Sequence, residues 1–70
     1  MKELLIFKDL FGQGSTKFIG DSMIEFRIKG DLDVALSYAR RIISKHGLNL
    51  TARTTGTTSS YGAFEVIINS

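Results

Sequence analysis

Residue types that carry specialised chemistry are absent from this chain or nearly so. It has no cysteine and a single histidine, His46. Disulfides and thiolate metal sites are therefore excluded, and one histidine cannot build a multi-histidine metal site. Proline is also absent. Because proline cannot donate to a strand ladder, its absence leaves every predicted strand free to pair, including those at the sheet edges.

The chain also has little length and little net charge. Its 70 residues make one domain at most, of a size that leaves a small stability margin. The apolar run 4–7 is too short for a secretory signal, and no stretch approaches the roughly 20 apolar residues of a membrane span. We therefore expect a cytoplasmic protein without a membrane partner. A net charge of +2 is small for a dedicated nucleic-acid binder.

Residues 31–47 predict an amphipathic helix. Asp31 can accept from the free amides of the first turn, and Gly47 can adopt the left-handed conformation that ends a helix. Apolar residues between them recur at the spacing of one helical face: Leu32, Ala35, Leu36, Ala39, Ile42 and Ile43.

The rest of the chain is predicted to form strands and loops. The segment 22–29 alternates, with Ile24, Phe26 and Ile28 on one side, as in an antiparallel strand with one wet face. The predicted strands cover residues 3–9, 22–29, 48–53 and 63–69. A flexible loop, 12–20, and a polar hairpin connection, 54–62, separate them. The expected fold is a single small α+β domain of order β-β-α-β-β, with one helix on one face of an antiparallel sheet whose strand order stays open.

Catalytic signals are weak. Residues 12–17, Gly-Gln-Gly-Ser-Thr-Lys, look like a phosphate loop, but a strand rather than a helix is predicted to follow. The acidic residues near the helix start are explained by capping, and His46 by the helix dipole. We therefore predict no catalytic residue, no metal ligand and no cofactor, and expect that the protein is not an enzyme.

Basic residues gather on the second half of the helix at Arg40, Arg41 and Lys45. One interpretation is favourable interaction with the helix dipole and with solvent. The other is a patch that contacts phosphates or an acidic protein surface. The candidate contact residues are Arg27, Lys29, Arg40, Arg41, Lys45, Arg53 and Tyr61.

Two further features suggest a binding surface. The threonine-rich hairpin 51–60 is either a plain exposed hairpin or an edge that adds to the sheet of a partner. Met23 and Ile67 interrupt otherwise polar strand faces and would lie on the sheet face that the helix leaves open. Whether the loop 12–20 or the hairpin 54–62 is the binding element stays open.

Residues 22–54 resemble the central segment of the small bacteriophage-encoded inhibitors of host RNA polymerase. The resemblance is carried by an alternating strand, by Leu-Asp-Val-Ala-Leu at 32–36 opening the helix, by Gly47 and by a following strand with Thr51 and an arginine. Here the helix is basic, whereas the helix of that family is acidic. The resemblance implies a compact binding protein of similar shape, and it transfers neither a target nor a site residue.

We therefore expect a small protein-binding module, an inhibitor or adaptor of phage or mobile-element origin that covers a surface of a larger protein. The alternative is a nucleic-acid-binding protein that uses the modest basic patch. A third possibility is a homo-oligomer formed through residues 4–7 or through Met23 and Ile67.

Overall fold

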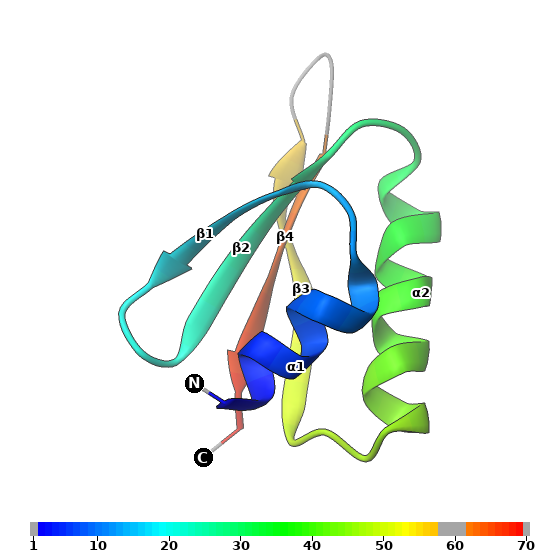
Figure 1. The fold of residues 1–70 in the computed structure, drawn as a ribbon. Helices are drawn as coiled ribbons and strands as arrows, with labels where there is room; N and C mark the ends of the chain where they lie inside the picture. Colours follow the sequence, from blue (N-terminus) through cyan, green and yellow to red (C-terminus); the bar gives the residue numbers. More distant parts are fainter. Residues whose placement is uncertain (1, 58–61, 70) are drawn as a thin grey trace.

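The computed structural model describes residues 2–57 and 62–69, which form an α+β fold (Figure 1). Its elements are α1 (Lys2–Phe11), β1 (Ser15–Ile19), β2 (Met23–Ile28), α2 (Leu32–Lys45), β3 (Leu50–Thr57) and β4 (Gly62–Ile68). The observed order is therefore α-β-β-α-β-β. The prediction of a four-stranded antiparallel sheet is confirmed, and the predicted order and single helix are wrong.

The segment predicted as a first strand, 3–9, is the helix α1. A short continuous apolar run does not distinguish a buried strand from a helix, and the prediction chose the strand. The helical period becomes visible only when Phe11 is included, because Leu4, Phe7 and Phe11 are the residues that α1 buries. Most residues of α1 also have good helix propensity.

The first strand of the sheet instead comes from the segment predicted as a loop, 12–20. Residues 15–19 pair antiparallel with β2, from Ser15 opposite Arg27 to Ile19 opposite Met23. Gly14, directly before this strand, has φ +81°, and a Cβ there would lie 2.8 Å from the carbonyl oxygen of Arg27. The glycine that suggested a flexible loop is therefore needed for a close approach of two strands.

The sheet has the order β1-β2-β4-β3, and each neighbouring pair is antiparallel. The predicted strands 22–29, 48–53 and 63–69 correspond to β2, β3 and β4. The third strand is longer than predicted because threonines after Arg53 continue it, with an irregularity in register between Thr54 and Gly56. Tyr61 and most of the hairpin tip lie outside the described residues.

The predicted amphipathic helix is confirmed as α2. The Asp31 carboxylate accepts from the amides of Asp33 and Val34 at 2.9 and 3.3 Å. At the other end Gly47 has φ +62°, and the amide of Leu48 donates to the carbonyl of Ile43 at 3.0 Å. This is a Schellman ending, which satisfies carbonyls that the last turn leaves free.

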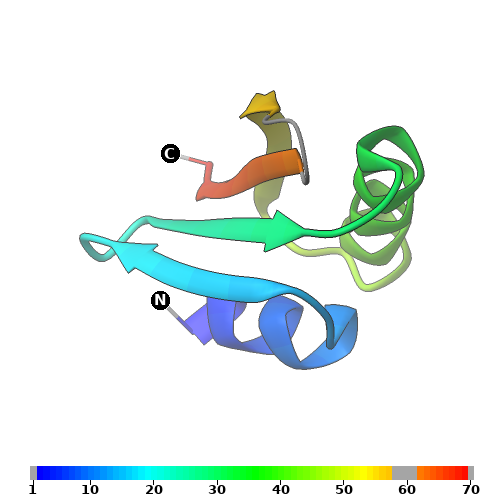
Figure 2. The ribbon, with the colours of Figure 1, turned by 90° about the horizontal axis from the view of Figure 1, so that it is seen from above.

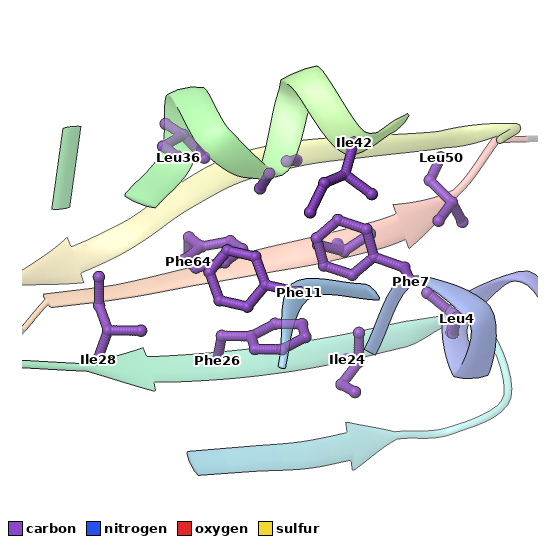
Figure 3. Close-up of a cluster of buried hydrophobic side chains, with 13 residues drawn as sticks. Leu4, Phe7, Phe11, Ile24, Phe26, Ile28, Leu36, Ile42, Leu50 and Phe64 are labelled. Atoms are coloured by element: carbon purple, nitrogen blue, oxygen red, sulfur yellow. The ribbon is translucent and has the colours of Figure 1, made fainter. Parts of the chain in front are cut away.

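Both helices lie on the same side of the sheet (Figure 2). Between helices and sheet is an aromatic core, in which the rings of Phe26 and Phe64 stack with centroids 5.0 Å apart (Figure 3). Phe7 and Phe11 of α1 approach Phe26 edge-on at 5.5 and 5.2 Å. The first helix therefore supplies a large part of the core. Neither α1 nor α2 lies over the opposite face of the sheet.

Candidate functional site

The sheet face turned away from α1 and α2 is a regular surface that no described element covers. We call it the open face. Its side chains come from alternate positions of the strands, and the pairing register arranges them in three rows across the sheet. They are Ser15, Lys17, Ile19, Met23, Glu25, Arg27, Thr51, Arg53, Ala63, Glu65 and Ile67.

The middle row carries four charges. Reading from β1 to β3, Lys17 is opposite Glu25, Glu25 is opposite Glu65, and Glu65 is opposite Arg53. We call these four residues the charged row. Two glutamates directly opposite each other repel, so the row depends on the cations at its ends. Arg53 donates from Nε to Glu65 Oε1 at 2.5 Å.

The two glutamates of the charged row are partly enclosed although no described helix or strand covers the sheet there. The side chain of Glu65 is 13% exposed and that of Glu25 is 21% exposed, whereas the arginines that pair with them are more than half exposed. The Arg27 Nε lies 3.4 Å from Glu25 Oε1. The arginine side chains therefore shield the carboxylates and leave their own charge exposed to solvent.

One end of the open face is apolar. Ile19, Met23 and Ile67 lie in one row, with Met23 opposite both of the others, and Thr51 ends the row on β3. We call Ile19, Met23 and Ile67 the apolar corner. Ile19 is 43% exposed, and Met23 and Ile67 are half-buried. The prediction that Met23 and Ile67 lie on the open face is confirmed by the register.

The predicted basic residues are divided between two surfaces. Arg27 and Arg53 lie on the open face, and each pairs with a glutamate. Arg41 and Lys45 are exposed on α2, which covers the other face. The guanidinium of Arg40 donates from Nε and Nη2 to the carbonyl oxygen of Ala52 at 3.4 and 3.2 Å, so it closes part of the β3 edge. Lys29 is exposed just after β2, and Tyr61 lies outside the described residues.

The glycine-containing loop before β1 does not have the arrangement of a phosphate loop. It follows the C-terminal end of α1 and leads into a strand, so no helix N-terminus faces an anion there. A hollow of about 370 Å³ beside this loop is lined by residues that include Lys8, Asp9 and Gly12. Lys17, the lysine of the motif, stands opposite Glu25 on the open face instead.

Other site chemistry is sparse in the part of the chain that the structure describes. Among residues 2–57 and 62–69, no three His, Asp or Glu side chains lie close enough to hold a metal ion. Among residues 2–55 and 62–69, no polar or charged residue is buried.

Sequence reasoning missed Lys17 and the two glutamates as members of one site. The alternation of β2 and β4 places Glu25 and Glu65 on polar faces, and this much is readable from the sequence. Glu25 and Glu65 are opposite each other because β2 pairs with β4 and not with β3. The alternation of apolar and polar residues does not determine which strands pair. Lys17 was missed because its segment was predicted as a loop.

Comparison of the chain with protein-family models, with curated proteins and with solved structures found no match. None of the helices described in residues 2–57 and 62–69 is long and apolar enough to cross a membrane.

Proposed function

We propose that this protein is a small protein-binding module that docks a larger protein on its open face. The observation that carries the proposal is the combination of an apolar corner with a charged row on a sheet face that no described element covers. An apolar anchor with a rim of charged groups is the usual composition of a protein interface. In this proposal the chain is an inhibitor or adaptor that covers a surface of the larger protein.

The distribution of charge favours a protein partner over a nucleic acid. Binding to phosphates gains most of its free energy from cations that are free to neutralise them. Here Arg27 and Arg53 already neighbour glutamates, and Arg41 and Lys45 belong to the other side of the molecule. A partner that offers both an apolar side chain and mixed charges matches the open face better than a uniformly anionic backbone.

The test begins with capture of partners from lysate by tagged protein, with nuclease treatment and a high-salt wash. Binding of the captured protein is then measured for wild type and for Ile19→Lys/Arg27→Gln. Both substituted side chains are exposed, so the fold is retained. Arg53 is left in place because it neutralises Glu65. The matched control is Arg41→Glu/Lys45→Glu on α2.

We expect the open-face variant to weaken binding at least about tenfold, the loss of about 1.4 kcal/mol, and the α2 variant to bind as wild type. The opposite pattern, together with loss of the captured partner on nuclease treatment, would contradict the proposal and favour a nucleic-acid ligand.

A further inference from the structure

The first helix is apolar on its outer side as well as on the side that packs on the core. Leu4, Phe7 and Phe11 are buried, yet Leu5 and Ile6 are 47% and 38% exposed. Leu10 is 39% exposed on the flank of the helix next to Ile6. A helix on the surface of a soluble protein normally turns a polar face to water. The exposed side of α1 therefore has the composition of an interface.

Two opposite charges bracket this apolar surface. Lys2 and Asp9 are seven residues apart, so they lie two turns apart on the same side of α1, with Leu5 and Ile6 midway between them. Both are exposed. Each has the unfavourable sign for the dipole of its own helix, because the lysine is in the first turn and the aspartate in the last. The interaction of Lys2 and Asp9 with the helix dipole therefore does not stabilise α1.

We propose that α1 forms an antiparallel pair with α1 of a second copy of this chain. The two-fold axis passes beside Leu5 and Ile6, so that these side chains meet their equivalents. Lys2 then faces the partner's Asp9, and Asp9 faces the partner's Lys2. This is the self-complementarity that an isologous dimer requires. A parallel pair would put like charges opposite each other.

The open face is a poorer surface for a second copy. In a face-to-face dimer with its two-fold axis along the strands, Lys17 would oppose Arg53 and Glu25 would oppose Glu65. If the two-fold axis instead ran perpendicular to the strands, along the charged row, each charged residue would face the same residue of the second copy. Both arrangements pair like charges, which costs binding free energy.

The helix pair would leave both open faces available. Because α1 packs on the sheet face opposite the open face, the outer surface of α1 points away from the open face (Figures 1 and 2). The dimer would present two open faces at its two ends, and it does not depend on the proposed function of that face.

The experiment is sedimentation equilibrium of the whole chain over a wide concentration range, without any partner. Wild type should shift from monomer to dimer as concentration rises. Lys2→Glu places glutamate opposite aspartate, and Asp9→Lys places lysine opposite lysine, so each variant alone should dimerise at least about tenfold more weakly. The two variants mixed should form a heterodimer with both ion pairs restored, and Lys2→Glu/Asp9→Lys should dimerise like wild type.

These substitutions separate association from folding. Each replaces a charge of unfavourable sign for the dipole of α1 with a favourable one, so thermal unfolding of the dilute monomer should be unchanged or slightly higher in temperature. A wild-type chain that stays monomeric at all concentrations would overturn the proposal. So would a dimer that neither single variant weakens, or a mixture that forms no heterodimer.

Discussion

At the scale of single residues, Arg40 and Arg41 are neighbours in the sequence with different surroundings in the fold. Arg40 bonds the carbonyl of Ala52 on the edge strand β3, whereas Arg41 points outward on α2. A sheet edge with free backbone groups invites pairing with another chain, and a side chain that binds those groups protects the edge. The sequence offered two interpretations of Arg40, interaction with the helix dipole and a contact patch. The structure shows a third role, a hydrogen bond to the backbone of β3.

Replacing Arg40 by alanine should destabilise the protein by about 1 kcal/mol, because the Ala52 carbonyl loses its partner in a partly buried position. Urea unfolding followed by circular dichroism measures the change. Arg41→Ala is the matched control and should alter the free energy of unfolding by less than about 0.5 kcal/mol. Equal effects of the two substitutions would show that the bond of Arg40 contributes nothing.

At the scale of elements, α2 could be predicted and α1 could not. The cap at Asp31, the apolar spacing and the ending at Gly47 are all local signals, and they agree with one another. In α1 the run 4–7 is apolar at every position, so local pattern does not select between helix and strand. The helix is selected by the core, where Leu4, Phe7 and Phe11 pack against the sheet.

The N-cap of α2 gives a direct test of a local signal. Asp31→Ala should lower stability by about 1 kcal/mol, because the amides of Asp33 and Val34 lose their acceptor. For a chain of this length that corresponds to a fall of about 4–8 °C in the midpoint of thermal unfolding. Asp31→Asn retains an acceptor oxygen and should recover most of the loss. A fall of equal size in both variants would mean that the charge, rather than the cap bond, matters.

At the scale of the whole molecule, one core joins the first helix to strands far along the chain. Phe7 and Phe11 contact rings of β2 and β4, and the Glu3 carboxylate accepts from the amide of Asn49, before β3, at 2.8 Å. A fold of this size has a small stability margin. The loss of one large core side chain should therefore unfold the whole sheet rather than α1 alone.

Phe7→Ala should cost about 3–5 kcal/mol, because the ring is fully buried and the cavity left behind is lined by other aromatic rings. We expect loss of strand as well as helix signal in the circular dichroism of the variant. Leu5→Ala, on the outer side of the same helix, should leave the dilute monomer folded. If Phe7→Ala kept its sheet and lost only helix signal, α1 would be an independent appendage.

By itself the sequence determined the α+β class, the helix α2 with both ends, and the alternation that places Met23, Glu25 and Arg27 on one strand face. These features depend on local spacing and on backbone preferences that a few neighbouring residues set. Only the tertiary structure decided that α1 is a helix, that residues 15–19 are a strand, and that β2 pairs with β4. Those choices follow from long-range pairing and from burial in a shared core, and through them Glu25 meets Glu65 and Ile19 joins the apolar corner.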